Sequence, residues 1–210
     1  MWDQHPTTVP AVAVVNAFLH RAVASGAADF TPSKAHDLVY LTHGLHLARQ
    51  GKRLTADGLH ADAEGVFSPS TRSAGCRGTR RIDKPLTRML PDGDSGLLRE
   101  QTPLISSKSE LNELINSVWS RWGLVSSFDL REFTRAPGSP WDLVWNGEER
   151  HGTAPRRIPD STIRCWFMRA LAESETSVIT PAAELNAPRA EARTPATEKL
   201  PSGVGVLRPV

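Results

Sequence analysis

The chain has little cysteine, a single tyrosine and no long apolar run. Its two cysteines, Cys76 and Cys165, lie far apart and outside any C-x-x-C pair. A disulfide framework is therefore excluded, and a reducing compartment is the simpler expectation. No stretch reaches the roughly 18 apolar residues that a membrane-spanning helix needs. The start, Met1 to Pro6, lacks the basic region of a secretion signal. We therefore expect a cytoplasmic protein without a membrane partner.

An excess of charge of one sign is also missing. The formal net charge of the 210 residues is +2, so the charge of the whole molecule predicts neither nucleic acid nor membrane as a partner. Hydrophobic residues make up 39% of the chain, which is enough for the core of one or two domains. The chain has six tryptophans, and five of them lie in the second half.

The sequence lacks the motifs that carry common enzyme chemistry. It has no G-x-x-x-x-G-K-[ST] phosphate loop, no G-x-G-x-x-G, no G-x-S-x-G and no H-E-x-x-H. Asp92 to Gly96 has the acid spacing of a calcium loop, but Leu97 and Pro103 stand where that loop needs glycine and glutamate. We expect a turn there, no cofactor and no enzyme activity.

Apolar periodicity predicts helices along most of the chain. The first has one apolar face and ends near Gly26, and the second begins at the cap Thr31-Pro32 and ends at Gly51. The alternation over residues 59–64 suggests an edge strand or an extended segment. A capping box at Ser107 to Glu110 predicts a helix from about residue 107 to Gly123. Three further helices are predicted after Ser126, Ser127 or Asp129, after Ser139, and from Ile158-Pro159-Asp160.

Two segments have a different character. Residues 72–108 hold eight Lys or Arg against four Asp or Glu, which predicts a long basic loop with a hairpin about Asp92-Gly93. Residues 173–210 contain five prolines and no aromatic residue, so we expect a disordered tail. The predicted fold class is mainly α: a compact multi-helix domain over residues 8–172 with a small β element, the basic loop and the tail.

Histidines and one cysteine are the remaining candidates for chemistry. His36, His43 and His46 lie on the second predicted helix, and a metal site using His43, His46 and His20 is conceivable. Local packing is the simpler interpretation. Cys76 lies close to Arg72 and Arg77, which lower a thiol pKa when they are near, but no partner histidine is identifiable. An ordinary thiol is the expectation.

The basic loop is the local feature that suggests a macromolecular partner. A solvated loop is its simplest interpretation, an acidic protein partner is the next, and nucleic acid is the third because no aromatic residue between 72 and 88 is available for base stacking. The candidate partner-binding residues are Arg77, Arg80 and Arg81, together with Trp141 and Trp145 if either ring is exposed.

Several short motifs together resemble the SocA-like Panacea antitoxin domain. They are Leu38-Val39-Tyr40, His43-Gly44, His46-Leu47-Ala48, Gly51-Lys52, Gly65, Val118-Trp119, Gly123, Thr134 and Gly138-Ser139-Pro140-Trp141. The resemblance covers about residues 8–172. Val66 stands where the family usually has proline, and Arg135 stands where it has histidine, so no role of that histidine is carried over.

The resemblance implies a mainly helical domain that neutralises a cognate protein toxin, encoded next to it, by direct contact. Such neutralisation needs a complementary surface rather than a catalytic set. One member of that family delivers its toxin to a ClpXP-type protease, so an adaptor of this kind, or a phage-associated interaction module, is the alternative expectation. A nucleic-acid-binding regulator that uses residues 72–88 is the third.

Overall fold

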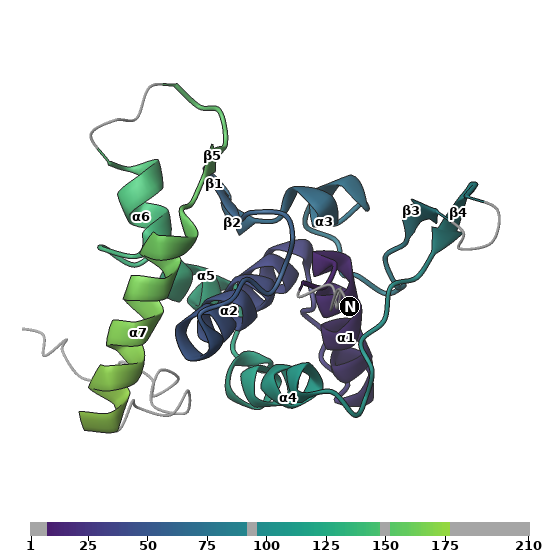
Figure 1. The fold of residues 1–210 in the computed structure, drawn as a ribbon, viewed down its shortest axis with the longest axis horizontal. Helices are drawn as coiled ribbons and strands as arrows, with labels where there is room; N and C mark the ends of the chain where they lie inside the picture. The colour runs from purple at the N-terminus through teal and green to yellow at the C-terminus, as the bar shows by residue number, and fades with distance from the viewer. Residues whose placement is uncertain (1–7, 92–95, 148–151, 177–210) are drawn as a thin grey trace, which may run out of the picture.

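The computed structural model describes residues 8–91, 96–147 and 152–176, which form a mainly α-helical domain with a small β element (Figure 1). The predicted fold class is confirmed for this part of the chain. The elements in chain order are α1 Ala11–Ala24, α2 Pro32–Gln50, β1 His60–Asp62, β2 Gly65–Phe67, α3 Pro69–Ser73, β3 Arg88–Pro91, β4 Leu98–Gln101, α4 Glu110–Trp122, α5 Ser127–Thr134, α6 Pro140–Trp145, β5 Arg156–Arg157 and α7 Asp160–Thr176.

Helix α2 forms the centre of the domain (Figure 1). It begins where the Thr31 side chain accepts a hydrogen bond from the Lys34 N–H, and it ends at Gly51, whose φ of 67° suits glycine. Burial is not confined to one apolar face of this helix, since 14 of its 19 residues are buried. Helices α1, α4, α5 and α7 and strand β2 all contact it. Polar residues of α2 are therefore buried together with apolar ones.

Strands β1, β2 and β5 form an antiparallel sheet in the order β2-β1-β5. The expected edge strand at residues 59–64 is therefore central, because β5 pairs with its second side. The pairing partner comes from nearly 100 residues later in the chain, where the local sequence pattern gives no sign of it. The Trp141 Nε1–H donates to the Asp62 carbonyl at 2.9 Å and so joins α6 to β1.

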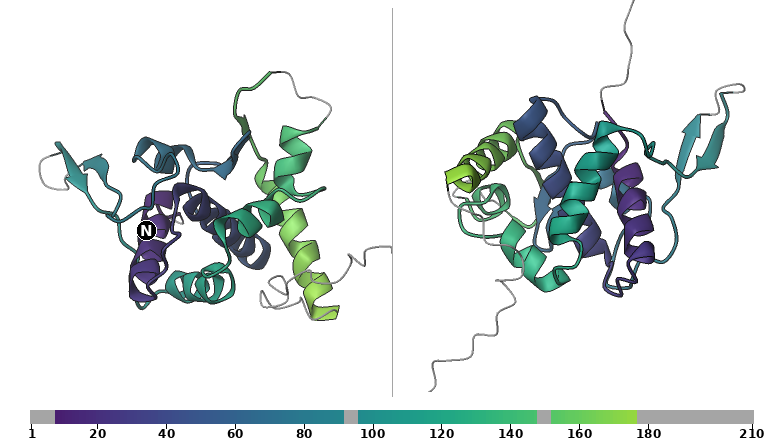
Figure 2. Two further views of the ribbon diagram at one scale, coloured as in Figure 1. Left: turned by 180° about the vertical axis from the view of Figure 1, so that it is seen from behind. Right: turned by 90° about the horizontal axis from the view of Figure 1, so that it is seen from below.

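Strands β3 and β4 form the predicted hairpin, which projects from the end of the domain opposite α7 (Figure 2). Its turn, residues 92–95, lies outside the described residues. Asn16 of α1 holds the two arms of this segment: its Nδ2 donates to the carbonyls of Leu86 and Pro103 at 2.9 and 3.0 Å, and its Oδ1 accepts from the Leu86 N–H at 2.8 Å.

Helix boundaries follow the predicted caps with two exceptions. Ser126 caps α5 and Ser139 caps α6 as expected. Helix α4 starts two residues later than its predicted capping box, because residues 106–109 form a turn and the Ser109 hydroxyl accepts from the Asn112 N–H. Helix α7 continues to Thr176, so residues 173–176 of the expected tail are helical; Ala172, Glu173 and Glu175 are good helix formers. Residues 177–210 lie outside the described residues.

Candidate functional site

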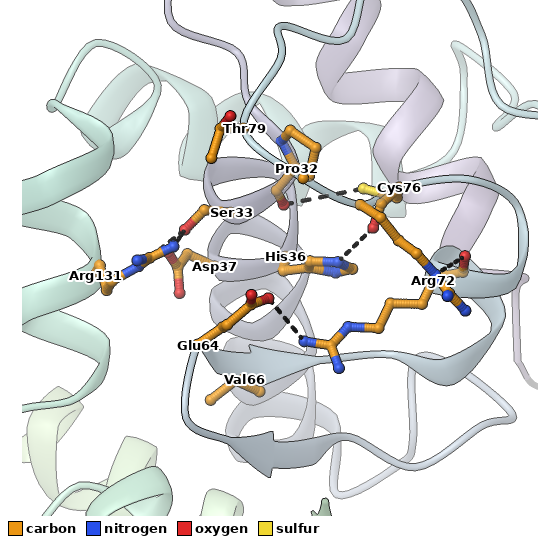
Figure 3. Close-up of a pocket in the computed structure, with 12 residues that line it drawn as sticks. Pro32, Ser33, His36, Asp37, Glu64, Val66, Arg72, Cys76, Thr79 and Arg131 are labelled. Carbon is orange, nitrogen blue, oxygen red and sulfur yellow. Dashed lines mark hydrogen bonds and ion pairs between the residues drawn. The ribbon is translucent and has the colours of Figure 1, made fainter.

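A polar pocket of about 420 Å³ lies beside the first turns of α2 (Figure 3). The start of α2 forms one wall, α5 a second, and β2, α3 and the segment after α3 the others. Charged and polar side chains come from α2, α3, α5, the segment after α3 and the turn between β1 and β2, so groups far apart in sequence meet here. The residues used below are Ser33, His36, Asp37, Glu64, Arg72, Cys76, Arg77 and Arg131.

His36 links α2 to α3 rather than serving as a free base. Its Nε2 lies 3.1 Å from the Cys76 carbonyl and its Nδ1 3.2 Å from the Thr71 hydroxyl. Because a carbonyl oxygen only accepts hydrogen bonds, we assign the ring proton to Nε2. The unprotonated Nδ1 then faces the Thr71 hydroxyl. Burial lowers the His36 pKa to about 4, and the nearby Arg72 charge adds to this, while the Cys76 carbonyl opposes it. The ring is therefore neutral near pH 7.

Asp37 is the buried acid of the pocket, with 3% of its surface exposed. The Thr134 hydroxyl of α5 donates to Oδ1 at 2.8 Å, whereas Oδ2 has no hydrogen-bond partner among the described residues. Burial raises the Asp37 pKa to about 7, although the Thr134 hydrogen bond and the charges of Arg131 and Arg135 oppose that rise. Acid and carboxylate forms therefore coexist near neutral pH.

Three arginines line the pocket, and they differ in how their charge is balanced. Arg72 pairs with Asp62 and Glu64 and lies over the Phe67 ring. Arg131 donates to the Ser33 hydroxyl, and Arg77 donates to the Arg72 carbonyl at 2.9 Å. Neither Arg131 nor Arg77 forms an ion pair with an acid in the part of the chain that the structure describes.

The Cys76 thiol is buried, and burial raises its pKa to about 12 against the opposing charge of Arg72. Its Sγ lies 3.9 Å from the Pro32 carbonyl, and the His36 ring contacts the Cys76 carbonyl rather than the thiol. A thiol in this state stays protonated, in agreement with the expected ordinary thiol. The pocket presents charge and hydrogen-bonding groups for binding rather than an activated nucleophile.

The predicted partner-binding residues fall into two groups. Arg77, Arg80 and Arg81 are exposed after α3 and, with Lys84, line a second hollow of about 300 Å³ beside the pocket. Trp141 and Trp145 are 4% and 5% exposed and stack with their ring centroids 6.5 Å apart. The condition that either ring is exposed is not met, because both rings fill the interior where α6 meets the sheet. Of the predicted partner-binding residues, the three arginines are therefore exposed and the two tryptophans are buried.

His43 lies in a second buried cluster. Its neighbour Asp160 comes from a distant part of the chain and cannot be predicted from the local sequence. Its Nδ1 is 3.4 Å from the Thr55 hydroxyl and its Nε2 3.6 Å from Asp160 Oδ1 at the start of α7. Asp160 also pairs with Arg53 and Arg157. Among the residues that the structure describes, no group of three metal-ligating side chains is found, and the His43 ring lies between Thr55 and Asp160.

The two departures from the resembling family occupy structural positions. The Arg135 guanidinium lies over the Trp141 ring, 4.1 Å from its centroid. Val66 is buried in β2 opposite Ala61 of β1. Val66 therefore packs within the sheet and also lines the polar pocket, and the partly exposed Arg135 covers Trp141 of α6.

Fold and pocket together define a helical domain with a polar binding pocket beside an exposed basic strip. Comparison with protein-family models, with curated proteins and with solved structures gave no match. No helix within the described ranges is long and apolar enough to cross a membrane.

Proposed function

We propose that this protein is an antitoxin that binds a protein toxin directly through the polar pocket and the adjoining strip of Arg77, Arg80 and Arg81. The observation that carries the proposal is this continuous surface: three exposed arginines adjoin a pocket in which one further arginine, Arg131, has no acidic partner at ion-pair distance among the described residues. Such a surface complements an acidic protein face. The motif resemblance supplies the toxin as the kind of partner.

The direct test is co-expression with the neighbouring open reading frame. That frame is placed under an inducible promoter, and growth is measured with and without this protein. Rescue of growth, together with co-purification of the two chains, is the expected result. A neighbour that is harmless alone, or toxic but neither rescued nor bound, would contradict the proposal and favour the ClpXP-type adaptor or the interaction module.

Charge reversal tests which surface binds. Changing Arg77, Arg80 and Arg81 to Glu should abolish rescue and weaken the complex by at least about 100-fold, since three attractive charges become repulsive. A matched control changes Arg49, Arg164 and Arg169 to Glu; these are equally exposed but lie on α2 and α7. The control should rescue like the wild type. Loss of rescue in both triple variants would point to net charge instead of this surface.

A nucleic-acid-binding regulator is the second candidate because the same strip is basic. It predicts that binding to DNA or RNA falls steeply with salt, with a slope that reports the number of phosphates contacted. Filter binding at two salt concentrations distinguishes the two candidates: the protein complex should survive salt that releases nucleic acid.

A further inference from the structure

The polar pocket contains one arginine, Arg131, whose charge is not paired with an acid among the described residues. Arg131 donates only to the neutral Ser33 hydroxyl, so its positive charge is not neutralised by a contacting acid among the described residues. Arg72 differs because Asp62 and Glu64 already balance it. Arg131 is thus a cation at the pocket wall that is available to an anion.

Two further features favour an anion at the same place. Pro32 and Ser33 are the first residues of the 19-residue helix α2 and line the pocket, so the positive end of the helix dipole points toward it. Asp37, lying between His36 and Arg131 in Figure 3, is buried and has an Oδ2 without a partner among the described residues. When protonated, this oxygen is a hydroxyl donor, since Oδ1 already accepts from Thr134.

We propose that this pocket binds the carboxylate of an aspartate or glutamate side chain on a protein partner, with Arg131 as the paired cation and the protonated Asp37 as the second donor. That the partner is a toxin rests on the function proposed above, whereas the carboxylate site does not. A cavity of about 420 Å³ is large enough for one side chain and lies in the lower part of the range of ligand pockets, roughly 300–1,000 Å³.

A carboxylate fits the site better than a phosphate. A guanidinium pairs with a planar carboxylate through two parallel hydrogen bonds, and one added negative charge is balanced by Arg131. Glu64 lies at the same pocket and would repel a dianion more strongly. The inferred ligand therefore carries one negative charge.

Binding should depend on pH through Asp37. The groups that face it are Arg131, Arg135 and Thr134 of α5 and Tyr40 of its own helix, while Arg72, Glu64 and His36 share the pocket. The lowered pKa of His36 keeps that ring neutral between pH 6 and 8, and the arginines stay charged. With a pKa of about 7, the protonated fraction of Asp37 falls about tenfold between pH 6 and pH 8.

The test is an NMR titration of the full chain with N-acetylaspartate amide, using N-acetylasparagine amide as the matched neutral probe. We expect saturable amide shifts confined to Ser33, Asp37, Arg131 and their neighbours with the acid alone, and binding about tenfold weaker at pH 8 than at pH 6. Inorganic phosphate is the third probe. Tighter binding of phosphate than of the aspartate probe, or shifts of equal size with the asparagine probe, would overturn the inference.

Three variants make the test specific. Arg131→Gln should reduce the affinity for the aspartate probe at least about tenfold, while Arg164→Gln, which lies on α7 outside this pocket, should leave it unchanged. Asp37→Asn keeps a donor at the Oδ2 position, so the variant should bind the probe equally at pH 6 and pH 8. The amide spectrum of each variant also reports whether it is folded. Equal binding by Arg131→Gln, or unchanged pH dependence in Asp37→Asn, would refute the assignment.

The two proposals can fail separately. A carboxylate site without rescue of the neighbouring toxin would leave a module that recognises acidic peptides and would remove the antitoxin function alone. Rescue without any probe binding would keep the antitoxin function and place the toxin contact outside this pocket.

Discussion

At the scale of single residues, Gly44 determines how closely α2 and α7 pack. A Cβ at this position would overlap the ring of Phe167. That ring is buried and packs edge-on against Tyr40, with centroids 5.4 Å apart. Gly44 is one of the residues that carry the family resemblance, and the close approach of two helices is sufficient reason for glycine there.

Gly44→Ala should therefore destabilise the domain even though alanine is the better helix former. Overpacking costs about 1–3 kcal/mol and occasionally more, and the gain in helix propensity offsets about 1 kcal/mol of it. We expect a net loss of up to about 2 kcal/mol by urea unfolding. Combining it with Phe167→Leu should cost less than the sum of the two single changes, because leucine makes room for the methyl group. Strict additivity would show that the two side chains do not compete for space.

At the scale of elements, the β3–β4 hairpin is attached to the domain without being part of its core. Most of its side chains are exposed, with Met89 and Leu98 among the exposed apolar ones. An isolated two-stranded hairpin is marginally stable in water. Its attachment depends on the three hydrogen bonds of Asn16 to Leu86 and Pro103, which lie before and after the strands.

Replacing residues 88–101 by Gly-Ser-Gly should accordingly change the free energy of unfolding by less than about 1 kcal/mol. The ends can be joined because Arg88 and Gln101 are paired in the hairpin. Asn16→Ala should instead cost about 2–3 kcal/mol, since it leaves partly buried backbone groups without partners. Urea unfolding of both variants checks this contrast. A large loss on hairpin removal would show that its strands contribute to the core.

The elements also show what the sequence can and cannot predict. Caps and apolar periodicity are local, so they correctly placed α1, α2, α5 and α6 and the hairpin. The central position of β1 depends on β5, which joins it from a distant part of the chain. The capping box at Ser107 was a valid local signal, but the competing cap at Ser109 starts α4. Local signals define elements, while their order in a sheet is set by long-range pairing.

The candidate site was less predictable for the same reason. The exposed arginines after α3 follow from composition, and their surface position is confirmed. No sequence pattern marks Asp37, because its burial results from α5 and β2 closing over one face of α2. Trp141 is a partner-binding candidate in the sequence because the exposure of one tryptophan in a capped helix cannot be predicted from local pattern. Its hydrogen bond to Asp62 shows that it supports the sheet instead.

At the scale of the whole molecule, buried ionisable groups on α2 make stability depend on pH in opposite directions. The pKa of Asp37 is about 7 in the folded state and about 3.9 in an unfolded chain, so the folded protein binds more protons between these values. Stability from this group is complete below pH 4 and is lost as pH rises through 7. His36 and His43 have pKa values lowered to about 4 by burial, so their contribution is lost as pH falls from about 6.5 to 4.

Asp37→Asn should remove the loss of stability that occurs as pH rises, and it should leave the loss that the two histidines cause as pH falls. At pH 8 the wild type holds a buried carboxylate with an oxygen unpaired among the described residues, so the variant should be more stable relative to wild type there than at pH 5. The difference between the two pH values is on the order of 2 kcal/mol, because one unit of pKa is worth about 1.4 kcal/mol. Urea unfolding at pH 5, 6, 7 and 8 measures it.

Glu132→Gln is the matched control, since it makes the same change of acid to amide at an exposed position of α5. Its stability should follow that of the wild type at every pH, because the Glu132 side chain is exposed and not buried as Asp37 is. If Asp37→Asn also followed the wild type, the Asp37 carboxyl would titrate as it does in an unfolded chain. The protonated donor in the pocket would then be lost together with the pH dependence of carboxylate binding, because both depend on the same buried oxygen.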